Sequence, residues 1–287
     1  MMYKNIFKTY VLLAGLGGLL VLIGSVLAPN GVGAAIGLAL GLIIVGASYW
    51  FSDTLAIKSA RATPANEQQM PGYYRIMRDL TQRANMPMPT LYVTPDMQPN
   101  AFATGRNPEH AAVAVTQGLL HHLEESEIRG VLAHELSHVK NRDILIGSVA
   151  AAVATGISFI ANMLMFSAMF GGGRDDDEGG NPIGLLALAI LAPLAATILQ
   201  MAVSRSREFE ADASAARMIG DGEPLARALL RLESTARNIP MEVQPAQATK
   251  YITNPLAGQK VQFANLFTTH PSTQDRVDRL RSRAWTS

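Results

Sequence analysis

Four long apolar runs interrupt an otherwise mixed sequence. They cover residues 9–28, 31–51, 144–170 and 182–203. A helix of about 20 apolar residues spans the hydrocarbon core of a bilayer. The pattern therefore predicts four transmembrane helices. A signal peptide is the alternative for the first run, and a buried hairpin of a soluble core is the alternative for the last two.

These runs divide the chain into four parts. We predict an N-terminal transmembrane hairpin at 1–51, a polar part at 52–143, a second transmembrane hairpin at 144–203 and a polar part at 204–287. The loop at 171–181, which joins the third and fourth runs, is rich in glycine and acidic residues. Both polar parts are long enough to contribute to one folded domain.

Basic residues are distributed unevenly about the apolar runs. Of the 24 Lys and Arg residues, nine lie in 52–143 and twelve in 204–287, whereas Arg174 alone lies in the 171–181 loop. Basic residues collect on the cytoplasmic side of a membrane. Both termini and both polar parts are therefore predicted to be cytoplasmic, and the acidic loop is predicted to be external.

The composition excludes several kinds of functional site. The chain is 48% hydrophobic and only 16% charged, with a net charge of +1, whereas soluble domains contain about 25% charged residues. The basic residues form no patch interleaved with aromatic side chains, so we expect no nucleic-acid partner. There is no cysteine, which excludes disulfides, thiolate ligands and a cysteine nucleophile. Histidine and carboxylate side chains remain as ligands for a transition metal.

Apolar residues recur with helical spacing in the segment SEIRGVLAHELSHVKNRD, residues 126–143. The predicted buried stripe comprises Ile128, Val131, Leu132, Leu136 and Val139. His134 and His138 lie one turn apart on a neighbouring face, and Glu135 projects beside them. Two histidines with this spacing can bind one zinc ion, and the carboxylate can accept a proton from water. The segment therefore predicts a zinc hydrolase.

A third ligand is expected on a second helix, in the segment SRSREFEADASAARMIG at 204–220. Glu208 and Glu210 point in nearly opposite directions, because two residues turn a helix by about 200°. Asp212 follows Glu208 by four residues on the same face, where it could hold a ligand histidine by its other ring nitrogen. Glu210 has only Ser214 in that position. We therefore predict Glu208 as the ligand.

Three short segments before the H-E-x-x-H helix have the composition of strands. They are TLYVT at 90–94, AFAT at 101–104 and AAVAVT at 111–116, separated by turns that contain Pro and Gly. The predicted fold class is therefore an α+β membrane protein, mainly α-helical, with four transmembrane helices and a small β-sheet.

Several motifs together resemble the HtpX family of membrane-bound zinc metallopeptidases and, more distantly, the CaaX-prenyl proteases. The matching segments are HELSH at 134–138, NRD at 141–143, SRSREFEAD at 204–212, NAFATG at 100–105 and THPSTQDRV at 269–277. The likeness implies a gluzincin-like peptidase domain in which His134, His138 and Glu208 bind one Zn2+ per chain. It also implies proteolytic quality control of damaged membrane proteins in the bacterial inner membrane.

The resemblance also implies roles around the metal. Zinc lowers the pKa of bound water from near 16 to about 7, and Glu135 would act as the general base. His270 would stabilise the oxyanion, with Pro271 stiffening the chain beside it. Arg276 is expected either to position a carbonyl or to lie on a solvated helix.

Substrate peptides are expected to add to a sheet edge at NAFATG, with Asn100 and Ala101 as contacts.

The expected partners are the lipid bilayer, unfolded membrane proteins and the protein itself as an autolysis substrate. A prenyl-protein protease and a catalytically retired membrane scaffold are the alternative functions.

Overall fold

The computed structural model describes residues 31–147, 150, 205–241, 243, 248, 250–255 and 271–286, together with scattered positions before residue 22. The first, third and fourth predicted transmembrane runs and the acidic loop therefore lie wholly or largely outside the described residues. The second run coincides with helix α2. None of the helices formed by the described residues has both the length and the apolar character that a bilayer span requires.

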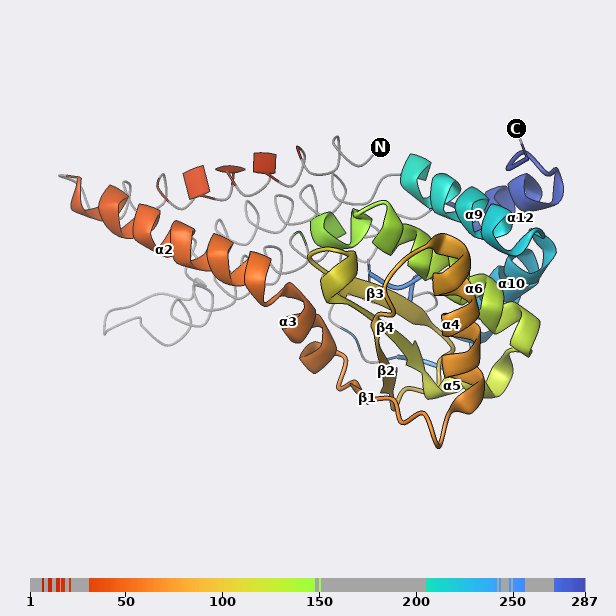
Figure 1. Ribbon diagram of the computed structural model, residues 1–287. Helices are drawn as coiled ribbons and strands as arrows, with labels where there is room; N and C mark the ends of the chain where they lie inside the picture. The colour runs from red at the N-terminus through yellow and green to blue at the C-terminus, as the bar shows by residue number, and fades with distance from the viewer. Residues whose placement is uncertain are drawn as a thin grey trace, which may run out of the picture.

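Helices dominate the described part of the chain, and they surround one small sheet (Figure 1). The strands are β1 (Thr63–Pro64), β2 (Thr90–Thr94), β3 (Ala101–Gly105) and β4 (Ala111–Thr116). The helices are α2 (Val32–Trp50), α3 (Ser52–Ser59), α4 (Pro71–Ala84), the 3-10 helix η1 (Pro108–His110), α5 (Gln117–His122), α6 (Glu125–Lys140), α9 (Arg205–Ile219), α10 (Glu223–Ala236) and α12 (Thr273–Arg281). This mainly helical fold with a small mixed sheet confirms the coarse prediction.

The sheet has the strand order β1-β2-β4-β3, with β3 at one edge. β2 and β4 pair in parallel, while β3 and β1 pair antiparallel to their neighbours. The three strands predicted from sequence are all present. The two-residue strand β1 was missed, because so short a segment ending in a proline carries no strand pattern.

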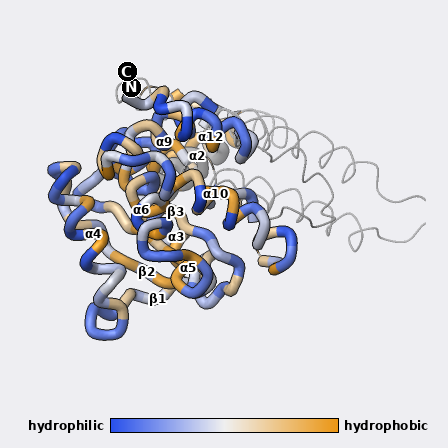
Figure 2. Tube along the Cα trace, turned by 90° about the vertical axis from the view of Figure 1, so that its right-hand side faces the viewer, coloured by the Kyte–Doolittle hydropathy of each residue, from blue (hydrophilic) through white to orange (hydrophobic). Residues whose placement is uncertain are grey.

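Different elements cover the two faces of the sheet. On one face, buried residues of α4, β2, β4 and α6 form the main hydrophobic core. On the other face, Ala56 and Ile57 of α3 pack with Phe102 of β3 and with Tyr251. Hydrophobic colouring follows the strands, whereas the outer turns are mostly hydrophilic (Figure 2). Helix α6 therefore lies inside the molecule, between the sheet and the C-terminal helices.

All five residues of the predicted stripe on α6 are buried. The helix begins with a capping box in which Glu124 and Glu127 exchange hydrogen bonds with each other's backbone. Gly130 lets α10 approach closely, because a Cβ atom at this position would lie 2.7 Å from the Leu225 backbone nitrogen. The α6–α10 contact thus depends on the absence of a side chain.

Replacing Gly130 with alanine is expected to lower the free energy of unfolding by about 1–3 kcal/mol, because the added methyl group meets the backbone of α10. Gly72→Ala is the matched control, since open space surrounds that position in α4. It should change stability by less than about 1 kcal/mol. Thermal unfolding of both variants in detergent measures the difference, and equal melting temperatures would contradict the crowding argument.

Candidate metal centre

Three of the sequence-predicted residues meet where α6 crosses α9. One ligand atom from each of His134, His138 and Glu208 lies within 4.8 Å of the other two. The two Nε2 atoms are 3.1 Å apart, and the Glu208 carboxylate oxygens lie 3.8 Å from His134 Nε2 and 3.5 Å from His138 Nε2. His134 and Glu208 are buried, while His138 is partly exposed. The geometry is that of a small site for one ion.

Each histidine contacts a carboxylate through Nδ1, the ring nitrogen that is not directed at the donor cluster. Asp212 Oδ1 lies 2.9 Å from His134 Nδ1, and Asp143 Oδ2 lies 3.1 Å from His138 Nδ1. A carboxylate at Nδ1 fixes the tautomer that leaves the Nε2 lone pair available to a metal. The donor set and its supporting carboxylates therefore fit a zinc ion.

The charges at the site favour a cation. Burial lowers the pKa of His134 to about 4, although Asp212 opposes the shift. Burial acts in the same direction on His138, but the negative charges of Glu208 and Asp143 outweigh it and raise its pKa to about 9. The negative charges of Glu208 and Asp143 thus favour a cation beside His138, and a bound metal ion would supply positive charge there.

Glu135 lies beside the donor cluster and does not belong to it. Its side chain is buried, and burial raises the pKa of its carboxyl to about 7, while a hydrogen bond from the Ala103 backbone opposes the shift. A carboxyl group with a pKa near neutrality can both accept and return a proton. The contact with Ala103 also places Glu135 next to the edge strand β3.

Arg276 is buried, so of its two predicted alternatives the position on a solvated helix is wrong. Its side chain is 2% exposed and binds both carboxylate oxygens of Asp212, with Nε–Oδ2 at 2.8 Å and Nη2–Oδ1 at 2.7 Å. Its Nη1 donates to the Ile252 carbonyl at 2.9 Å. Although burial opposes ionisation, the Arg276 charge lowers the pKa of Asp212 to about 2. Arg276 therefore positions Asp212, which in turn holds His134.

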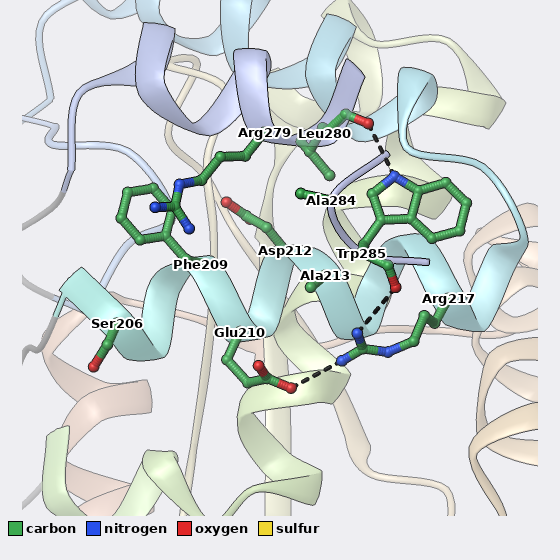
Figure 3. A pocket seen from close by; sticks show the side chains of 10 residues that line it. All are labelled: Ser206, Phe209, Glu210, Asp212, Ala213, Arg217, Arg279, Leu280, Ala284 and Trp285. Carbon is green, nitrogen blue, oxygen red and sulfur yellow. Dashed lines mark hydrogen bonds and ion pairs between the residues drawn. The ribbon is translucent and has the colours of Figure 1, made fainter. Parts of the chain in front are cut away.

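Glu208 belongs to the donor cluster, whereas the Glu210 side chain points toward Arg217 (Figure 3). It pairs with Arg217 at 2.8 Å, and Arg217 also donates to the Trp285 carbonyl at 3.1 Å. These side chains line a cavity of about 430 Å3 between α9, α12 and the C-terminal turn. Glu210 takes no part in the donor cluster, so the structure separates the two glutamates as the helix rotation predicted.

The remaining predicted site residues have different positions. His270 lies outside the described residues. Asn100 and Ala101 are fully buried, and both form hydrogen bonds to the chain's own segment at 252–253. Their predicted contact with substrate remains a prediction.

Asp143 was missed as a functional residue, although the signal was available. It follows His138 by five residues, three residues after α6 ends, and it lies in the matched NRD segment. A carboxylate placed just beyond the end of a metal-binding helix can turn back to the last histidine. The sequence pattern predicts such a carboxylate only on the second helix, at Asp212.

Asp143→Asn is expected to weaken zinc affinity by about 10- to 100-fold, because the amide is a poorer partner for the His138 ring. Zinc competition with a chromophoric chelator measures the affinity. Asp96→Asn is the control, since Asp96 pairs with Arg61 away from the cluster. Equal affinities in Asp143→Asn and the wild type would show that Asp143 does not support His138.

Comparison with known proteins agrees with this site. Residues 67–284 match Peptidase family M48, whose members are metallopeptidases. The fold and the His-His-Glu cluster thus belong to a metallopeptidase. The chain belongs to peptidase family M48, within its HtpX branch, which confirms the resemblance found in the sequence.

Similar relatives match nearly the full length of the chain. A protease HtpX homolog of Pelotomaculum thermopropionicum is 51% identical over 282 residues, covering 98% of this chain and 99% of the relative. One from Trichormus variabilis is 50% identical over 278 residues, covering 96% of each. The crystal structure of S. mikatae Ste24p aligns at 19% identity with a TM-score of 0.48, and this chain spans 65% of that protein.

Proposed function

We propose that this metallopeptidase is a membrane-integrated, zinc-dependent endopeptidase that cleaves unfolded or damaged membrane proteins on the cytoplasmic side of a bacterial inner membrane. The observation that carries the proposal is the cluster of His134, His138 and Glu208 beside the buried Glu135. The two histidines of the cluster lie on α6, which ends four residues before the third apolar run. One Zn2+ per chain would complete the site.

The chain's own residues supply most of the catalytic machinery. His134, His138 and Glu208 would hold the ion, which supplies a Lewis acid that acidifies water and polarises the peptide carbonyl. Glu135 accepts a proton from the attacking water and returns it to the leaving amine. His270 donates a hydrogen bond to the developing oxyanion.

Exposed apolar side chains support the membrane location. Along α2, Leu42 and Ile43 are 66% and 65% exposed, and Trp50 at its end is 58% exposed. Contiguous exposed apolar surface marks a face that binds lipid or protein. A tryptophan at the end of an apolar helix is typical of a bilayer interface. The peptidase domain follows this helix directly through α3.

The metal ligand assignment is tested with the two glutamates of α9. Glu208→Ala is expected to lose zinc and cleavage of unfolded casein, because one of three donors is gone. Glu210→Ala is the matched control and should retain one zinc per chain, since Glu210 pairs with Arg217 instead. Elemental analysis of both purified variants measures zinc. Retention of zinc by Glu208→Ala with its loss from Glu210→Ala would overturn the assignment.

The side of action is tested with two reporter proteins in the host membrane. Each has one transmembrane helix and an unfolded tail, placed on the cytoplasmic side in one reporter and on the external side in the other. Only the cytoplasmic tail should be cut, and only when Glu135 is present. Cleavage of the external tail would contradict the proposed topology while leaving the peptidase chemistry intact.

A further inference from the structure

Exposed apolar side chains continue past the end of α2 into the peptidase domain. Trp50, Phe51 and Leu55 are 58%, 57% and 49% exposed. The Leu55 N–H donates to the Phe51 carbonyl at 2.8 Å, so Leu55 lies one helical turn after Phe51 on the same side of the chain. The next two residues of α3, Ala56 and Ile57, are buried against the sheet. Helix α3 therefore packs on the sheet with one face and leaves an apolar surface exposed among the described residues.

Two cations border this apolar surface. Lys58 follows Leu55 by three residues and lies in the last turn of α3. Arg106, the residue after β3, has its guanidinium carbon 4.8 Å from the centre of the Trp50 ring. Neither the Lys58 nor the Arg106 side chain forms an ion pair with another residue in the described part of the chain. No described carboxylate therefore neutralises these two charges.

The position of Arg106 leaves its donors available to an anion. A guanidinium that lies over an aromatic ring still directs its N–H groups outward in its own plane, where they fit the oxygens of a phosphate. A tryptophan beside it is typical of the interface between the acyl chains and the headgroups of a bilayer. The long side chain of Lys58 can extend from an apolar surface to the headgroups. The surface therefore combines an apolar part with two groups that bind phosphate.

The other apolar runs of the chain match this surface less well than lipid does. Each of them could cover the exposed apolar side chains, but none of them contains a charged residue that could pair with Arg106 or Lys58. An anionic phospholipid supplies both parts, since its acyl chains cover apolar side chains and its headgroup attracts basic residues. The surface is also continuous with α2, which coincides with the second apolar run. Lipid is therefore the occupant that fits both the apolar part and the charges.

We propose that Trp50, Phe51, Leu55, Lys58 and Arg106, here called the junction surface, lie on the cytoplasmic leaflet and bind the headgroups of anionic phospholipids. The inference rests on the proposed function, because it takes α2 to lie in the bilayer. Arg106 directly follows β3, so this contact holds the sheet at the level of the headgroups. The peptidase domain is then oriented by lipid as well as by its connection to α2.

The position of the junction surface is tested by quenching of tryptophan fluorescence. The chain has two tryptophans, Trp50 and Trp285, and both are replaced by phenylalanine in the full-length protein. Leu55→Trp then places a single reporter on α3, and Leu230→Trp, at a 38% exposed position of α10, is the matched control. Figure 1 shows α3 and α10 on opposite sides of the sheet. In nanodiscs made with lipids brominated along the acyl chain, Leu55→Trp should be quenched and Leu230→Trp should not.

The outcomes separate this inference from the proposed function. Trp285→Phe alone keeps the native reporter at Trp50, the last residue of α2. Quenching of Trp50 without quenching of Leu55→Trp would leave α2 in the bilayer and overturn the junction surface, because another part of the chain or a second copy would then cover it. No quenching at either position would refute the membrane location of α2, and with it the proposed function.

The preference for an anionic headgroup is tested with Trp285→Phe, in which Trp50 reports on the lipids beside Arg106. Brominated phosphatidylglycerol should quench Trp50 more strongly than the same amount of brominated phosphatidylcholine. Each basic residue near the surface favours anionic lipid by about five-fold, so Arg106→Gln and Lys58→Gln should each lower the preference by about that factor. Added salt should also lower it, because the attraction is screened.

Arg75→Gln is the matched control for these two variants, because Arg75 is exposed on α4 and pairs with Glu125 at 2.7 Å. It should leave the lipid preference unchanged. Equal quenching by the two lipids in the protein with native Arg106 would overturn the headgroup site. A loss of quenching by both lipids in Arg106→Gln would show that Arg106 only holds Trp50 in place, and would overturn its role in lipid binding.

Discussion

Replacing Glu135 with glutamine is expected to reduce peptide hydrolysis by at least about 100-fold while leaving zinc bound. Glutamine keeps the size of the side chain but cannot accept the proton. The buried position and the raised pKa of the carboxyl are suited to that transfer. Zinc content and casein cleavage, measured in parallel with and without a chelator, separate the two effects.

The same variant also tests autolysis. Wild-type protein purified without chelator should show self-cleavage fragments, and Glu135→Gln should not. Hydrolysis that survives in Glu135→Gln would point to another base. Loss of zinc from this variant would instead place Glu135 among the ligands.

Arg276→Met is expected to lower the free energy of unfolding by about 3–5 kcal/mol, because it leaves the buried Asp212 carboxylate without its cation. It also removes the donor to the Ile252 carbonyl. Zinc affinity should fall as well, since Asp212 orients His134. Thermal unfolding in detergent and zinc competition provide the two measurements.

Arg279→Met is the control for Arg276→Met, because Arg279 lies on the same helix but is exposed, with its guanidinium 4.0 Å from the Phe209 ring centre. It should change stability by less than about 1 kcal/mol. Equal losses in the two variants would indicate that disruption of α12, and not the buried ion pair, causes the effect.

Local patterns in the sequence were sufficient for the helix that carries H-E-x-x-H. Its apolar stripe has the period of a helix, and the two histidines lie one turn apart whatever surrounds them. The choice between Glu208 and Glu210 was equally local, because rotation along one helix separates them. Strands β2, β3 and β4 were visible because each is a short apolar or β-branched run between turn residues.

Contacts between segments far apart in the sequence could not be predicted from such local patterns. Asp212 and Arg276 are 64 positions apart, and no repeat or spacing links them. An arginine in a charged C-terminal helix is usually solvated, so its burial depends on a partner that only the folded chain provides. The segment at 251–253 shows no apolar periodicity in the sequence. It contacts β3 through backbone groups, which every residue has, so its side-chain pattern does not reveal the contact.

The order of these parts along the chain has a consequence for biosynthesis. A nascent chain that has been translated only through α6 contains both histidines and Glu135 but lacks the third ligand, which is 70 residues further on. It also lacks Arg276, which holds Asp212 in place. A truncated product therefore has no complete centre, and hydrolytic capacity arises only when nearly the whole polypeptide has been made and has folded.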